Sequence, residues 1–219
     1  MNENDVNRFL DAAKTTPYYQ LFYLSLFTGL RRSEILALRW SDLDLPLCQA
    51  YVTRGLHHLQ TGEIVFTPPK SEKSRRMVPL SPSTAQLLQQ FKDRQTEERT
   101  AAALVLKDDD LVLKENDLVF SDINGKPLLP DSVTHAWIKL VRHNGLNGIR
   151  LQDARHSHAT ILFKQGVHPK IVQERLGHSS IQLTLDTYSH HVPGLQEAAA
   201  MGFDKVLLQQ CEKESVKEN

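Results

Sequence analysis

The sequence has little cysteine, no long apolar run and no excess charge of either sign. Its 219 residues include two cysteines, Cys48 and Cys211, which lie far apart and lack metal-ligand spacing, so no disulfide and no metal site is predicted. No window approaches the roughly 18 apolar residues that a membrane-spanning helix needs. The N-terminus also lacks the basic and apolar regions of a secretory signal. These absences predict a cytoplasmic protein that does not enter a membrane.

The net charge of zero argues at first against nucleic acid, because binding to a phosphate backbone depends on lysine and arginine. The charges are, however, unevenly spread along the chain. Residues 29–80 hold eight basic and five acidic residues, whereas residues 93–117 hold four basic and eight acidic ones. Such separation is typical of a protein with one face toward a polyanion, although charge alone does not distinguish this from ordinary solvated surface.

Hydrophobic spacing predicts an α+β chain that is mainly helical. Helices are expected at 5–14, 18–27, 33–38, 83–103, 131–143, 153–165, 169–176, 180–188 and 193–209. Short β runs at 50–56, 63–67 and 76–80 predict a small antiparallel sheet of three strands. Without a repeat or a linker rich in Pro, Gly or Ser, the simplest partition is one domain of residues 1–209 and a polar tail of residues 210–219.

Three residues of chemical interest, Arg155, His178 and Tyr188, lie within residues 152–191. Two short helices and their turns in this stretch could bring the three side chains to one pocket. Each of them alone has a plain structural explanation: a surface ion pair, a helix cap and a half-buried core tyrosine. A second arginine, Arg31, lies at a predicted turn between helices, and a turn with two lysines, residues 68–74, precedes the last β run. The combination, more than any one residue, points to a shared site.

These residues belong to five motifs that resemble, in order, those of the tyrosine recombinase (phage integrase) family. The motifs are Thr28–Glu34, a first arginine box; Lys70–Leu80, a lysine hairpin; Asp153–His156, a second arginine box; Leu176–His178, a second histidine motif; and Asp186–His190, a nucleophile motif. The resemblance extends over most of the chain. It implies the family's catalytic fold, a mixed helical domain with a small antiparallel sheet, and chemistry without a metal ion or other cofactor.

The resemblance implies that Tyr188 attacks a DNA phosphodiester, forms a covalent 3′-phosphotyrosine and releases a 5′-hydroxyl. Arg31 and Arg155 would stabilise the charge on the non-bridging oxygens, because guanidinium groups match that geometry and stay charged. Lys70 would protonate the leaving 5′-oxygen as a general acid. His178 would donate a hydrogen bond to the phosphate.

Further basic residues are expected to contact the DNA backbone. They are Arg32, Lys73, Arg75 and Arg76. Lys73 is the weaker candidate for the general acid, because the spacing of Lys70 to the end of the hairpin fits the family better.

Gln152 departs from the family pattern. The family usually has a histidine three residues before the second arginine, here Arg155, and glutamine cannot take up a proton at neutral pH. General-base help for Tyr188 is therefore reduced, and we expect slower cleavage rather than none, because acid–base catalysis typically contributes about 10²–10⁴-fold. Gln152→His is expected to raise the cleavage rate.

Other functions remain as alternatives. The histidine pairs at 156/158 and 190/191 lack the spacing of a zinc protease motif, so a metal site is disfavoured. A DNA-binding relative with weak or no catalysis is the stronger alternative, because arginines that bind phosphate serve binding as well as chemistry. A type IB topoisomerase would share the chemistry but relax one duplex instead of exchanging strands between two.

The expected partner is double-stranded DNA. The family implies a homotetramer on DNA and a monomer when free, with the C-terminal helix passed to a neighbouring protomer. Integrases of this family usually carry an N-terminal core-binding domain, and here the first helix already belongs to the catalytic domain. We therefore expect the core-binding domain to be absent and the chain to be either a fragment or a truncated gene product. Together with the zero net charge, this predicts weak DNA affinity.

Overall fold

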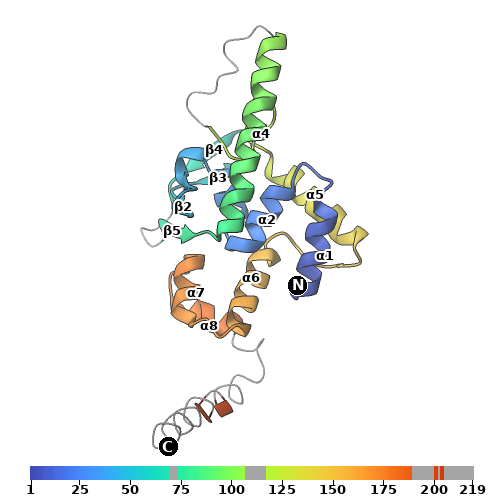
Figure 1. The fold of residues 1–219 in the computed structure, drawn as a ribbon. Helices are drawn as coiled ribbons and strands as arrows, with labels where there is room; N and C mark the ends of the chain where they lie inside the picture. The colour runs from blue at the N-terminus through green and yellow to red at the C-terminus, as the bar shows by residue number, and fades with distance from the viewer. Residues whose placement is uncertain (70–73, 107–116, 189–199, 202, 205–219) are drawn as a thin grey trace, which may run out of the picture.

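The computed structural model describes residues 1–69, 74–106, 117–188, 200–201 and 203–204 (Figure 1). The first helix, α1 (Glu3–Ala13), begins at Asn2, whose side chain accepts a hydrogen bond from the backbone of Asp5. This cap satisfies a backbone donor that the helix itself cannot pair. The inward face of α1 buries four apolar residues at helical spacing, which are Val6, Phe9, Leu10 and Ala13.

The helix α2 (Tyr19–Thr28) is apolar on most sides and packs against several other helices. With α1 and α5 (Pro130–His143) it forms the aromatic centre of the core: the rings of Phe9 and Phe22 lie 4.2 and 5.2 Å from that of Trp137. The helix ends at Gly29 in the left-handed conformation, with φ 66°. The chain turns directly into α3 (Arg32–Leu36), so residue 31 lies at a junction between two helices.

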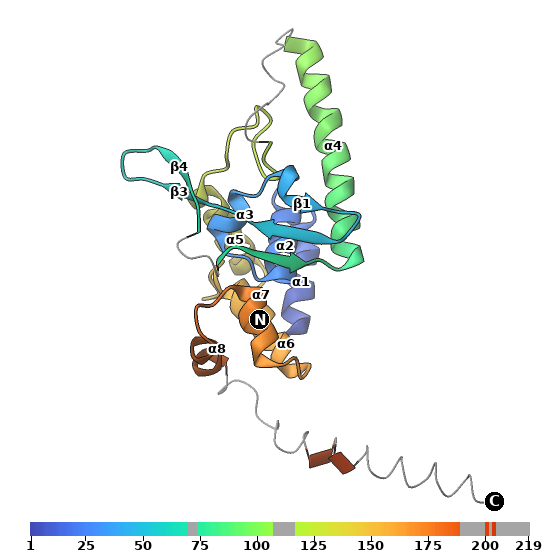
Figure 2. The ribbon, with the colours of Figure 1, turned by 90° about the vertical axis from the view of Figure 1, so that its left-hand side faces the viewer.

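The strands form two small antiparallel sheets instead of the one sheet predicted. β1 (Leu43–Asp44), β2 (Gln49–Val52) and β5 (Arg76–Pro79) form a three-stranded sheet in the order β1-β2-β5. β3 (Gly55–His58) and β4 (Ile64–Thr67) pair only with each other, and Figure 2 shows their hairpin projecting from the molecule. The predicted strand 50–56 is therefore divided between the two sheets, and the predicted strand 63–67 lies outside the three-stranded one.

Two polar side chains explain the division of that strand. The guanidinium Nε of Arg54 donates to the carbonyl of Ala37 at 2.8 Å, and the hydroxyl of Thr53 bonds the carboxylate of Asp42 at 3.0 Å. These contacts hold residues 53 and 54 against the end of α3 and the short 3₁₀ helix η1 (Trp40–Asp42). The chain therefore turns out of the first sheet before it can form β3.

The remaining helices lie close to the predicted ranges. They are α4 (Pro82–Leu106), α6 (Asp153–Lys164), α7 (Pro169–Leu176) and α8 (Ile181–Tyr188). In Figure 1 the helices α6, α7 and α8 lie together below α2 and the sheets. Most of the predicted helix 193–209 falls outside the described residues. Within the described residues, no helix has the length and apolar character needed to cross a membrane.

Candidate active site

The two predicted catalytic arginines bind consecutive carbonyl groups at the end of α7. Nη2 of Arg155 donates to the carbonyl of Leu176 at 2.7 Å, and Nη2 of Arg31 donates to that of Gly177 at 3.2 Å. Nη1 of Arg155 also donates to the carbonyl of Gly29 at 2.8 Å. The fold thus brings together the α2–α3 junction, α6 and the end of α7, and it places both guanidinium groups beside the next residue, His178.

Arg31 is held by its own helix. Its backbone N–H and its Nη1 each donate to the carboxylate of Glu34, both at 2.8 Å. The carboxylate is buried, which by itself would raise its pKa, but hydrogen bonds and charge from Arg76 and Arg31 outweigh burial and hold the pKa below its ordinary value. Glu34 therefore stays ionised and fixes Arg31, whose side chain remains 41% exposed and open to a ligand.

Arg76, which is predicted to contact the DNA backbone, is buried within the protein. Its Nη1 and Nη2 donate to the two carboxylate oxygens of Glu34, each at 3.0 Å, and its Nε donates to the carbonyl of Arg175 at 2.8 Å. The side chain is only 7% exposed. This burial does not fit the predicted contact with the DNA backbone. Arg76 instead joins β5 to α3 and α7, because a buried carboxylate needs a charged partner.

His178 follows the αL residue Gly177 that ends α7. Its Nδ1 lies 2.7 Å from the hydroxyl of the fully buried Thr184 on α8. Burial, together with the positive charges of Arg155, Arg31, Arg76 and His156, lowers the pKa of His178 to about 4. The ring is therefore neutral at neutral pH, so it can donate through one nitrogen and accept through the other.

An open cleft of about 860 Å³ lies beside Arg31 and Arg155. Of the residues predicted to act in catalysis or DNA binding, it is lined by Arg31, Arg32, Gln152 and Arg155. Arg32 is anchored on α5, where its Nη1 donates to the hydroxyl of Thr134 at 2.6 Å and the carbonyl of Pro130 at 3.3 Å. Gln152 is exposed at the N-cap of α6, where its side chain makes no capping hydrogen bond.

The predicted Lys70 and Lys73 lie outside the described residues. Arg75, immediately before β5, is exposed. The backbone of Tyr188 ends α8, which packs against α6 and α7; its side chain is outside the described part of the structure. The position of the predicted nucleophile is thus known only from its backbone at the end of α8. That helix belongs to the same group of helices as α6, which carries Arg155, and α7, which His178 follows.

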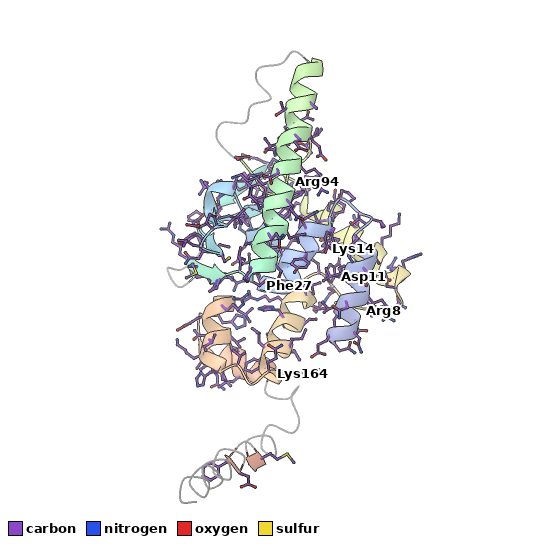
Figure 3. The ribbon with its side chains drawn as sticks, in the orientation of Figure 1. Arg8, Asp11, Lys14, Phe27, Arg94 and Lys164 are labelled. Atoms are coloured by element: carbon purple, nitrogen blue, oxygen red, sulfur yellow. The ribbon has the colours of Figure 1, made fainter. Side chains whose placement is uncertain are left out.

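Two residues that the sequence reasoning missed join the parts of the site. Nε of Arg175 donates to Nε2 of the buried His158 at 2.9 Å, and its two Nη atoms donate to the carbonyls of Pro79 and Phe27 at 3.0 and 3.1 Å. Figure 3 labels Phe27 at the level where α6 and α7 meet the upper part of the molecule. His158 stands three residues after Arg155, a helical spacing that could have indicated its inward position. No local pattern marks Arg175.

The arrangement suits an anion. The guanidinium groups of Arg31, Arg76 and Arg155 act electrostatically on the neutral His178, and those of Arg31 and Arg155 line the cleft. They carry their charge without a metal ion or a proton transfer. Within the described residues, no group of three or more His, Cys, Asp and Glu side chains could hold a metal. The chemistry that such a site favours is stabilisation of negative charge on a phosphodiester.

A comparison with models of protein families matches residues 1–193 to the phage integrase family. Among curated proteins, the chain is 29% identical over 200 residues to a "Tyrosine recombinase XerC-like" protein of Caldanaerobacter subterraneus subsp. tengcongensis, covering 88% of this chain and 50% of that protein. It is 32% identical over 190 residues to the ICEBs1 integrase of Bacillus subtilis (strain 168), covering 86% of this chain and 49% of that protein. The chain spans about half the length of both relatives.

Solved structures share the fold. The crystal structure of XerA recombinase matches with a TM-score of 0.69 at 19% identity, covering 92% of this chain and 64% of that one. The Tn1549 transposon integrase in complex with transposon right end DNA matches with a TM-score of 0.74 at 20% identity, covering 94% and 65%. These similarities confirm the predicted fold class. With its motifs in order, its fold shared and most of its length matched by the family model, the chain belongs to the phage integrase family.

Proposed function

We propose that this chain is the catalytic part of a site-specific DNA recombinase, which cuts and rejoins DNA strands through a covalent 3′-phosphotyrosine at Tyr188. The observation that carries the proposal is the meeting of Arg31 and Arg155 on consecutive carbonyls beside His178. Two guanidinium groups fixed beside one open cleft can hold both non-bridging oxygens of a phosphodiester. Their charge is in place before the reaction, so no reorganisation is needed when negative charge develops.

His178 donates a hydrogen bond to the same phosphate. This requires a proton on Nε2, and the hydroxyl of Thr184 supports that tautomer by donating to Nδ1 across 2.7 Å. The low pKa of His178, about 4, favours a neutral donor over a general acid. Thr184 is therefore a positioning residue in this proposal.

In the cleavage step Tyr188 gives its phenolic proton to a base, its phenolic oxygen forms a bond to phosphorus, and the bond to the 5′-oxygen breaks. Lys70 gives its proton to that oxygen, and rejoining reverses each transfer. Arg32, Lys73 and Arg75 contact the DNA backbone. Arg76 is left out of this set, because its side chain is only 7% exposed and bonds Glu34.

The proposed partner is double-stranded DNA, with a homotetramer on DNA and a monomer in its absence. The Tn1549 transposon integrase, which shares the fold, was solved in complex with transposon right end DNA, and this supports DNA as the substrate here. The cytoplasm is the proposed location, because the substrate is there.

Covalent trapping tests the proposal. The protein is incubated with nicked duplexes whose core sequence is randomised, and adducts that survive denaturation are isolated and sequenced. We expect adducts that mass spectrometry places on Tyr188, none with Tyr188→Phe, and a strong loss with Arg155→Lys, because lysine cannot make the bidentate contact. A wild-type protein without adducts on any sequence contradicts the proposed function.

The same preparation separates the alternatives. Retention of DNA without adducts supports the relative that binds DNA without catalysis. When adducts form, a second duplex is added: exchange of strands between duplexes identifies a recombinase, whereas relaxation of a supercoiled plasmid without exchange identifies topoisomerase chemistry.

A further inference from the structure

Gln152 and His156 stand one helical turn apart at the start of α6, and both line the cleft. Residues four positions apart lie on the same face of a helix. Side chains on a helix also lean toward its N-terminus, so the area that a residue covers lies over the preceding turn. The imidazole of His156 therefore lies on the same face of α6 as the side chain of Gln152, one turn further along the helix.

His156 is also close to the other groups of the site. It is exposed and follows Arg155 directly in sequence, and Arg155 lines the same cleft. In its protonated form it is one of the charges that lower the pKa of His178. The imidazole thus lies on the cleft side of α6, within electrostatic reach of the histidine proposed to bind the phosphate.

We propose that His156 is a further catalytic residue, which supplies the imidazole that position 152 lacks. The inference rests on the proposed function. As the phenolic oxygen of Tyr188 forms its bond to phosphorus, the neutral imidazole of His156 accepts the phenolic proton. The bond to the 5′-oxygen breaks, and that oxygen takes its proton from Lys70. On rejoining, His156 returns the proton to Tyr188.

Two other histidines line the cleft and serve as controls. His57 and His58 come from the projecting hairpin strand β3 and are exposed. Neither shares a helix with Gln152 or Arg155, so the register that directs His156 toward position 152 does not apply to them. Substitution of His57 therefore tests whether any imidazole at the cleft is sufficient.

The test measures the single-turnover rate of adduct formation on the nicked duplex recovered by covalent trapping. His156→Gln is expected to lower the rate about 100-fold, the lower range for a lost acid–base group. Adding Gln152→His to the His156→Gln variant is expected to raise the rate again by at least about tenfold, because it returns an imidazole to the same helix face one turn away. His57→Gln is expected to stay within about twofold of the wild type, because it removes no proton acceptor from the reacting group.

Each outcome has a defined meaning. If the wild-type protein forms no adduct, the proposed function itself fails. If the wild type forms adducts and His156→Gln is as fast, the role of His156 is overturned. The role of His156 is also overturned if His156→Gln is slow but its rate is not recovered by adding Gln152→His, and if free imidazole does not recover the rate of His156→Ala. A loss that is merely structural is not recovered by an imidazole from another source.

Discussion

Nε of Arg175 donates a hydrogen bond to Nε2 of His158 across 2.9 Å. Burial and the charge of Arg175 lower the pKa of His158 to about 4, so the ring is neutral and Nε2 is free of its proton. Nδ1 then carries the proton and donates to the carbonyl of Leu26 at 2.9 Å. One defined tautomer thereby links α7, α6 and the end of α2, the three segments that bring the predicted catalytic arginines together.

The stability of the fold should depend on pH through His158. Above pH 6.5, the ordinary pKa of histidine, the imidazole is neutral in both the folded and the unfolded protein. Between pH 6.5 and about 4, the pKa in the folded protein, the unfolded chain binds a proton that the native protein does not. The free energy of unfolding should therefore fall as the pH falls through this window, by up to about 3 kcal/mol. Urea denaturation between pH 7.5 and 4 measures the change.

His158→Gln is the control for that experiment, because glutamine does not titrate. His178 shifts in the same direction, so the variant should keep part of the pH dependence and lose the part due to His158. An identical pH dependence in wild type and variant would show that the buried imidazole is not responsible.

The carboxylate of Glu34 should contribute far more to the free energy of unfolding than a surface carboxylate does. It accepts four hydrogen bonds from Arg31 and Arg76 and is 8% exposed. Glu34→Gln should lower the free energy of unfolding by about 3 kcal/mol, because a buried guanidinium loses its counter-charge. Asp11→Asn is the matched control: Asp11 and Lys14 pair at 2.7 Å in the open, and the change should be about 0–1 kcal/mol. Equal effects of the two substitutions would refute the structural role of Glu34.

Gly177 should not tolerate a side chain. Its φ is 68°, and a Cβ atom would lie 2.8 Å from Nη1 of Arg76, which cannot move without breaking its bonds to Glu34. Gly166 has φ 74° and nothing within 4 Å, so Gly166→Ala should cost only the left-handed conformation, about 1–2 kcal/mol. Gly177→Ala should lower the free energy of unfolding by more than Gly166→Ala does, as measured by thermal and urea unfolding. A cost no larger than that of Gly166→Ala would mean that Arg76 is not held in place.

Thr184 should control the rate through His178. Thr184→Val keeps the shape of the buried side chain but removes the hydroxyl that lies 2.7 Å from Nδ1. The single-turnover cleavage rate should fall about tenfold, which corresponds to the net worth of one hydrogen bond. Thr184→Ser retains the hydroxyl and should remain within about threefold of the wild type, as expected when the hydrogen bond is kept. ¹⁵N chemical shifts of His178 should report the change of tautomer in Thr184→Val, and an unchanged tautomer there would exclude this role.

The sequence by itself determined the local structure and the order of the motifs. Asn2 capped α1, Gly29 ended α2, and Pro169 with Gly177 bounded α7, because caps and breakers act within a few residues. The predicted site residues Arg31, Arg155 and His178 could likewise be named from motifs alone.

Tertiary structure decided how those parts meet. It divided the predicted strand at Thr53 and Arg54, whose polar side chains bond the neighbouring α3 and η1. It buried Arg76 against Glu34, 42 residues away, and placed Arg175 against Pro79 and Phe27, 96 and 148 residues away. Such partners leave no local periodicity in the sequence, because the contact depends on the path of the whole chain between them.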